Sequence, residues 1–178
     1  SAAPPPAPPP PAALNKQHLR EARRAEPAVA QFDCSSAFNH AGREEVLDAI
    51  ERLAPTLTPA FATILTRTTF NMVKWSDGDY TRIPSTDGLT QGCPASPAAF
   101  CFLMLIVQRY FWEELKTLGG DDAVAATSLL AYLDGLMVVT ETEHLEAAIQ
   151  ALQNAQKKAR LIENQCKGTV WTKDGERP

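Results

Sequence analysis

Ala131-Tyr132-Leu133-Asp134-Gly135-Leu136-Met137-Val138-Val139 predicts a β-hairpin with an aspartate at its tip. Two apolar runs rich in strand-forming residues, 128–133 and 136–140, flank an Asp-Gly pair, which is the strongest short-range signal for a hairpin. We expect Gly135 to supply the positive φ of the turn. Because a carboxylate among apolar residues is costly to bury without a cation, a cation-binding strand tip is one interpretation. An ordinary Asp-Gly turn is the other, and this segment alone favours it.

The length and composition fit one globular domain with some unstructured sequence. The chain has 178 residues, of which 44% are hydrophobic and 21% charged, which is enough for a sizeable core. The net charge of -4 argues against a free-standing nucleic-acid binder, although local patches could still bind phosphate.

The cysteines and the apolar runs indicate the cellular compartment. Cys34, Cys93, Cys101 and Cys166 form no C-x-x-C pair and have no histidine at zinc-ligand spacing, so neither a structural zinc nor a disulfide framework is indicated. The longest apolar run, 98–107, is too short to span a bilayer, and no signal peptide is visible. We expect a soluble, reducing, intracellular setting, with nucleus and cytoplasm left open.

The N-terminus is rich in proline and alanine. Half of the 14 prolines fall between Pro4 and Pro11, in a tract that can form polyproline II but cannot bury a core. We predict a disordered tail over residues 1–13, in preference to a proline-motif ligand, and a domain over residues 14–178. Asn15 to Glu26 is predicted as a polar helix that Pro27 stops.

The rest of the chain alternates strand and helix patterns, which predicts an α+β fold with an antiparallel sheet covered by helices on one face. Gly119-Gly120-Asp121-Asp122 is interpreted as a solvated linker turn. A helix after the central hairpin is expected to begin with a capping box of Thr140 and Glu143. The other expected elements are a strand over 28–34, helices over 46–53, 58–71 and 97–116, a hairpin turning at 76–79, and a hairpin over 169–172 turning at Asp174-Gly175.

Two aspartates are each predicted at the end of a strand in the same small sheet. If the strands of Asp33 and Asp134 are neighbours, their carboxylates converge. Mg²⁺ prefers oxygen ligands, and two such ions about 4 Å apart clamp the attacking and leaving oxygens of a phosphoryl transfer. Acidic strand ends are common, so the pair needs a further element to support this chemistry.

The glycine-punctuated loop from Gly88 to Phe100 is that element. Gly88 and Gly92 are expected to let the backbone approach a ligand, and Gln91 offers an amide beside it. Ser96 is expected to cap a helix whose first residue is Pro97. An ordinary helix start explains Ser96 and Pro97 but not Gln91-Gly92.

Four segments together resemble the motifs of reverse transcriptases, in particular those of non-LTR retrotransposons. Phe32-Asp33-Cys34-Ser35-Ser36-Ala37-Phe38-Asn39 resembles motif A, and residues 88–100 match the motif B pattern G-x-x-Q-G-x-x-x-S-P-x-x-F completely. Tyr132-Leu133-Asp134-Gly135 resembles the Y/F-x-D-D of motif C, and Asn164-Gln165-Cys166-Lys167 resembles the N-x-x-K of motif D. The order and approximate spacing agree over nearly everything after the proline tract.

The resemblance implies a polymerase palm that adds deoxynucleotides to a DNA primer on an RNA template. Asp33 and Asp134 would hold two Mg²⁺ or Mn²⁺ ions, and Lys167 would neutralise or protonate the leaving pyrophosphate, unless it is simply a solvated lysine. Phe38 would exclude a 2′-hydroxyl, with a core aromatic as its alternative. Gln91 and Gly92 would line the nucleotide pocket. RNA, a DNA primer and dNTP are the implied partners, and neither a membrane nor an oligomer is indicated.

Departures from the family pattern weaken the implied activity. Gly135 replaces the second aspartate of motif C, so we expect the fold to survive while metal affinity falls. Arg160 and Glu163 stand where glycine and an apolar residue are usual in motif D. Fingers and thumb are largely missing, which suggests a partial, impaired polymerase. The alternative is an inactive retroelement-derived remnant that acts at most as a binding module, and Phe38 disfavours a third reading, a viral RNA-dependent polymerase palm.

Overall fold

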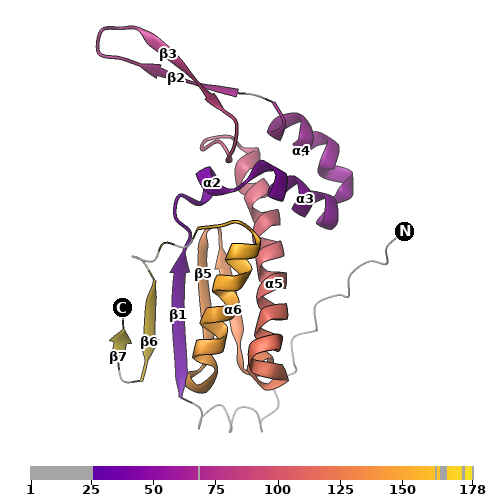
Figure 1. The fold of residues 1–178 in the computed structure, drawn as a ribbon, viewed down its shortest axis with the longest axis vertical. Coiled ribbons are helices and arrows are strands. Elements are labelled where there is room, and N and C mark those ends of the chain that lie inside the picture. The colour runs from indigo at the N-terminus through magenta and orange to yellow at the C-terminus, as the bar shows by residue number, and fades with distance from the viewer. Residues whose placement is uncertain (1–25, 68, 163, 165–167, 174, 178) are drawn as a thin grey trace.

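A five-stranded antiparallel sheet with the order β4-β5-β1-β6-β7 organises the chain (Figure 1). The computed structural model describes residues 26–67, 69–162, 164, 168–173 and 175–177. The predicted tail and nearly all of the predicted helix over 15–26 lie outside these residues. The strands of the sheet are β1 (Pro27–Asp33), β4 (Ser128–Tyr132), β5 (Gly135–Glu141), β6 (Thr169–Thr172) and β7 (Gly175–Arg177).

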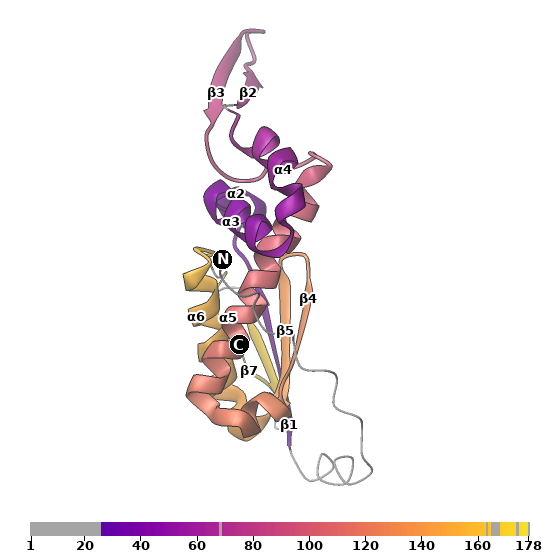
Figure 2. The same ribbon diagram turned by 90° about the vertical axis from the view of Figure 1, so that its right-hand side faces the viewer.

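Helices cover one face of this sheet, as predicted. Figure 2 shows α5 (Ala95–Ala126) and α6 (Leu145–Lys158) on the same side of the strands. Along β1 the buried residues alternate with more exposed ones, and the same period recurs in β5, as expected for strands buried on one face. The inward residues of these two strands are Ala28, Ala30, Phe32, Leu136, Val138 and Thr140.

Helix α5 forms the centre of the core. Phe100, Phe111 and Leu115 on this helix are fully buried, and it packs against both α6 and α3 (Arg43–Leu53). In the described part of the chain it is also the one helix that is long and apolar enough to cross a membrane by length and composition. Its role as a core helix accounts for that apolar character.

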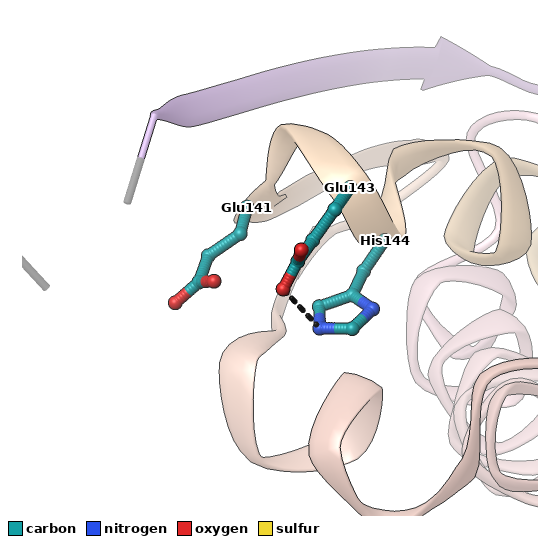
Figure 3. A group of neighbouring side chains, drawn as sticks. All are labelled: Glu141, Glu143 and His144. Atoms are coloured by element: carbon teal, nitrogen blue, oxygen red, sulfur yellow. Dashed lines mark ion pairs between the residues drawn. The ribbon is translucent and has the colours of Figure 1, made fainter. Parts of the chain in front are cut away.

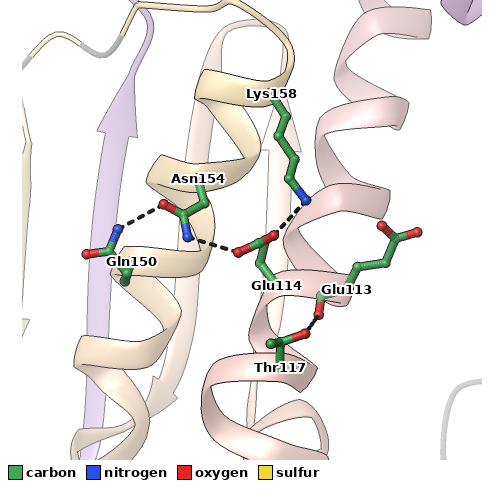
Figure 4. A network of polar contacts seen from close by, with 6 residues as sticks. All are labelled: Glu113, Glu114, Thr117, Gln150, Asn154 and Lys158. Carbon is green, nitrogen blue, oxygen red and sulfur yellow. Dashed lines mark hydrogen bonds and ion pairs between the residues drawn. The ribbon is translucent and has the colours of Figure 1, made fainter.

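A polar network joins α5 to α6 along the edge of their interface (Figure 4). Glu114 accepts hydrogen bonds from Lys158 Nζ at 2.6 Å and from Asn154 Nδ2 at 2.9 Å. Gln150 in turn donates to Asn154 Oδ1 at 3.0 Å. The two charge-assisted bonds to Glu114 hold α5 and α6 in register beside their apolar contact.

The predicted linker at 119–122 is wrong in extent. Helical structure continues to Ala126, and Gly120 alone departs from it with φ 74° and ψ -171°. This residue therefore kinks a longer helical segment instead of ending it. A Cβ at the neighbouring Gly119 would lie 2.5 Å from the Cβ of Ala123, which is buried.

The predicted helix over 58–71 is also too long. Helix α4 (Thr58–Leu65) follows the short turn η1 (Pro55–Leu57), and the chain then enters β2 (Thr69–Lys74), which pairs with β3 (Tyr80–Ser85). Cross-strand pairing thus overrides the weak helical pattern beyond Leu65. The hairpin predicted around 76–79 is confirmed. Strands β6 and β7 confirm the last hairpin, but Gly175 pairs with Thr172 as the first residue of β7, and Asp174 of the predicted turn lies outside the described residues.

The predicted capping box before α6 is wrong. Thr140 belongs to β5, where its buried hydroxyl lies 2.8 Å from that of Thr127. A short turn, η2 (Thr142–His144), leads into α6, and His144 occupies the N-cap without a side-chain hydrogen bond. Because Thr140 is a buried residue of β5, its hydroxyl does not reach the N-terminus of α6.

Candidate active site

The central hairpin turns through Leu133 and Asp134. Tyr132 pairs with Gly135, so the loop has two residues and Gly135 is already the first residue of β5. The positive φ of 51° falls on Leu133, and Gly135 is not among the residues with positive φ. The expected role of Gly135 in the turn is therefore wrong, because a two-residue loop takes its special conformation at its own central positions. A leucine with positive φ marks local strain at this tip.

Asp33 and Asp134 meet at one end of the sheet, as the sequence predicted. Strand β1 pairs with β5 so that Asp33 lies opposite Gly135, the residue next to Asp134. Both aspartates line a single hollow of about 540 Å³. The other lining residues are Gln31, Phe32, Tyr132, Gly135, Thr169 and Trp171.

The donors of this hollow suit a hard divalent cation. Two carboxylates supply anionic oxygen at its wall, which is the ligand type that Mg²⁺ and Mn²⁺ prefer. Position 135 faces Asp33 but carries no side chain. A Cβ on Gly135 would meet just the carbonyl oxygen of Tyr132 at 3.4 Å, an ordinary contact. The backbone therefore has room for a third carboxylate that the sequence does not provide.

The motif A segment and the Gly88 loop lie against each other. The short helix α2 (Ala37–His40) carries Phe38, whose carbonyl accepts a hydrogen bond from the N–H of Leu89 at 2.7 Å. A Cβ on Gly88 would lie 2.5 Å from the carbonyl oxygen of Asn39. Gly88 thus allows a close contact between two backbone segments, while its expected approach to a ligand stays a prediction.

The ring of Phe38 stacks on that of Phe100, with centroids 5.1 Å apart and an angle of 27°. Phe38 is partly buried at the edge of the main core. The contact fixes its ring at the sheet end that carries Asp33, because α2 follows β1 after three residues (Figure 1). Phe38 is not among the residues that line the hollow itself.

Gln91 and Gly92 are exposed on the loop before α5. Gly92 has φ 86°, and a Cβ there would have no other atom within 4 Å. Ser96 is buried, and its hydroxyl donates to the carbonyl of Thr90 at 2.8 Å. Ser96 therefore closes the loop from inside instead of capping α5, which corrects the prediction. Neither Gln91 nor Gly92 lines the hollow.

Lys167 lies outside the described residues, as do residues 163, 165 and 166. The N–H of Asn164 donates to the carbonyl of Asp33 at 2.9 Å, and the N–H of Ser35 donates to the carbonyl of Ile162 at 2.8 Å. Ile162 and Asn164 thus lie beside the end of β1.

Sequence reasoning missed the aromatic walls of the hollow. Tyr132 is 83% exposed and stands beside the aspartates, while Trp171 comes from β6. Gln31 shares the face of Asp33 by strand alternation, a signal that the sequence did contain. Trp171 and Thr169 join the site because β6 pairs with β1, and no local pattern indicates that pairing.

A second acidic group lies at the other end of β5. The ligand atoms of Glu141, Glu143 and His144 all lie within 4.8 Å of one another. Figure 3 shows the ion pair between His144 Nε2 and Glu143 Oε1, at 3.4 Å. An ion pair between Glu143 and protonated His144 is enough to explain why these two side chains lie close together, so we assign no metal ion to the group.

Comparisons with known proteins agree with this fold. The family model described as reverse transcriptase (RNA-dependent DNA polymerase) matches residues 2–176. The fold is similar to apo telomerase from Candida tropicalis, with TM-score 0.67 and 13% identity over 89% of this chain and 31% of that one. It is also similar to telomerase from Candida albicans in complex with a TWJ fragment of telomeric RNA, with TM-score 0.68 and 11% identity over 89% and 30%. These structural likenesses show the fold alone.

No curated protein sequence matches the chain. The chain spans about 31% of the length of the first telomerase structure.

Proposed function

The chain belongs to the reverse transcriptase family, and we propose that it is the palm portion of an RNA-directed DNA polymerase. The observation that carries the proposal is the shared hollow of Asp33 and Asp134 at one end of the sheet. Polymerases of this family use divalent metal ions. RNA template, DNA primer and dNTP are the proposed partners, and an origin in a non-LTR element is proposed from motifs A and B.

Asp33 and Asp134 would hold the metal ions, which when bound favour attack of the primer 3′-hydroxyl and neutralise charge on the phosphates. Tyr132 and Trp171 form walls on which a nucleobase or sugar could rest. Gln31 offers an amide beside them that can donate or accept a hydrogen bond.

The remaining site residues are proposed to act on the incoming nucleotide. Phe38 would exclude a 2′-hydroxyl, and its position at the sheet end that carries Asp33 supports this. Its stacking on Phe100 also fits the alternative, a core aromatic. Gln91 and Gly92 are exposed and accessible to a nucleotide. Lys167 would neutralise pyrophosphate, a role proposed from the resemblance of residues 164–167 to motif D.

We further propose that activity is impaired by the missing carboxylate at position 135. Two divalent cations bound by two aspartates carry more uncompensated positive charge than two divalent cations bound by three aspartates. Since Gly135 does not have positive φ and its Cβ position is accessible, Gly135→Asp should fold normally and bind metal more tightly.

Primer extension with Mg²⁺ or Mn²⁺ tests the function, with Mn²⁺ binding measured separately by calorimetry. Unchanged protein should extend a primer on RNA feebly, Gly135→Asp more strongly, and the double variant Asp33→Asn with Gly135→Asp not at all. Strong extension by the unchanged protein that Asp33→Asn abolishes would contradict the impairment. Extension that survives Asp33→Asn would overturn the site.

An inactive remnant that only binds a partner is the second candidate, and Gly135 is the observation in its favour. It predicts no extension and no gain in Mn²⁺ affinity for Gly135→Asp. Either gain would argue against it.

A further inference from the structure

Strands β2 and β3 form a separate two-stranded sheet that projects beyond α4, away from the main sheet (Figures 1 and 2). Arg43 ties its base to the domain, because its guanidinium donates to the carbonyl of Arg67 at 3.2 Å and to the hydroxyl of Ser85 at 3.3 Å. A lone hairpin is marginally stable in water and usually packs one face on something. The exposed residues of this hairpin are therefore a candidate surface for binding a partner.

One face of this hairpin carries three directly opposed pairs. Paired residues lie on the same side of an antiparallel ladder, and alternate pairs share a face. The register places Phe70 opposite Pro84, Met72 opposite Arg82 and Lys74 opposite Tyr80. All six are exposed, Phe70 by 46%, Met72 by 57% and Tyr80 by 59%. We call these six residues the Phe70 face.

Each aromatic ring of the Phe70 face has a cation beside it. The guanidinium carbon of Arg82 lies 4.3 Å from the ring centre of Phe70, and Lys74 Nζ lies 5.7 Å from that of Tyr80. The face contains no carboxylate, since Asp77 and Asp79 belong to the turn between the strands. Two positive charges therefore stand together with aromatic rings in a chain whose net charge is -4.

The opposite face differs in character. It pairs Asn71 with Ile83 and Val73 with Thr81, and none of these four residues is charged. The two faces of the hairpin therefore differ in charge, which would not be expected if both were simply exposed to solvent. A general hydrophobic docking surface would not require one cation for each ring.

We propose that the Phe70 face binds a single-stranded nucleic acid. Bases stack on Phe70 and Tyr80, while Arg82 and Lys74 contact the phosphates. Aromatic platforms with interleaved cations are the usual means of holding a single strand without sequence preference. The two rings are four residues apart along the ladder, roughly 13 Å, which provides two separate stacking positions. The surface is distinct from the Asp33 hollow, so it can be tested independently of polymerase activity.

Fluorescence anisotropy with a labelled single-stranded oligonucleotide of mixed sequence tests the charges in the full chain. The variant Lys74→Gln with Arg82→Gln should lose about tenfold in affinity or more, and the slope of log K against log salt should fall by about 1.4. The matched control is Arg52→Gln with Lys116→Gln, which removes the same charge from cations exposed by 58% and 67% elsewhere. The control should bind as the unchanged protein does.

Stacking is tested at a single ring. Tyr80→Leu should weaken binding by about fivefold to a hundredfold, and Tyr80→Phe should retain it. The indole N–H of Trp75 donates to the hydroxyl of Thr81 at 2.8 Å, so its NMR resonance shows whether the hairpin remains formed in each variant.

Equal affinity of the charge variant and its control would overturn the proposal, as would equal binding by Tyr80→Leu and Tyr80→Phe with the Trp75 resonance intact. Sedimentation that shows self-association lost on Phe70→Ser, without nucleic-acid binding, would instead make this face a contact between two copies of the chain.

Discussion

Replacing Gly88 by alanine tests whether the loop is held by close backbone contact. Gly88 has φ 73° and Gly92 has φ 86°, so alanine at either position costs roughly 1–2 kcal/mol for the left-handed conformation. At Gly88 the new Cβ would also lie 2.5 Å from the carbonyl oxygen of Asn39 and 3.0 Å from its carbon. These are backbone atoms, which cannot rotate aside, and such overpacking costs about 1–3 kcal/mol more. Gly92→Ala meets no other atom within 4 Å and serves as the matched control.

We therefore expect Gly88→Ala to lower the free energy of unfolding by about 2–5 kcal/mol and Gly92→Ala by about 1–2 kcal/mol. Urea unfolding followed by circular dichroism measures both, with m-values compared to confirm that the same surface is exposed. The larger loss is a substantial part of the 5–15 kcal/mol typical of a domain. Equal losses for the two variants would refute the close contact between Gly88 and Asn39.

Two further predictions concern polar anchors. Arg43→Met should lower the free energy of unfolding by about 2–4 kcal/mol, because Arg43 donates to the carbonyls of Gly88 and Leu65 at 2.9 and 3.3 Å. Hydrogen exchange should also rise at the base of the β2–β3 hairpin. Unchanged exchange there would contradict the anchoring role of Arg43. Hydrogen bonds from Lys158 and then Asn154 hold the pKa of the Glu114 carboxyl below its ordinary value of 4.5, so its stabilisation is present above that pH and is lost as the pH falls through the lowered value. Glu114→Gln should flatten this acid limb in urea midpoints measured against pH, and an identical limb in both proteins would exclude the contribution.

Local patterns predicted the parts of the fold that depend on neighbours along the chain. Residues 28–34 were predicted as a strand that ends near Asp33, and the Asp134-Gly135 pair predicted a hairpin at the right place. The errors arose where a hydrogen-bond partner outside the predicted motif decided the outcome. The hydroxyl of Thr140 pairs with that of Thr127, and the hydroxyl of Ser96 donates to the carbonyl of Thr90.

The candidate site divides in the same way. Asp33 and Asp134 could be named from strand ends and motif spacing, but the sequence assigned Gly135 to the turn because Asp-Gly pairs usually turn there. The register put the positive φ on Leu133 instead and left Gly135 opposite Asp33. Position 135 is thus a vacant place for a carboxylate, and its glycine is not required by the backbone.

The sequence by itself determined which residues are candidates for the site, because carboxylates, glycines and their spacing are properties of short segments. The tertiary structure alone decided that β1 lies between β5 and β6. That order brings Trp171 and Thr169 to the two aspartates in one hollow. Strand order depends on pairing between segments more than a hundred residues apart along the chain, and the two-residue period of a strand specifies which face is buried but not which neighbour it pairs with.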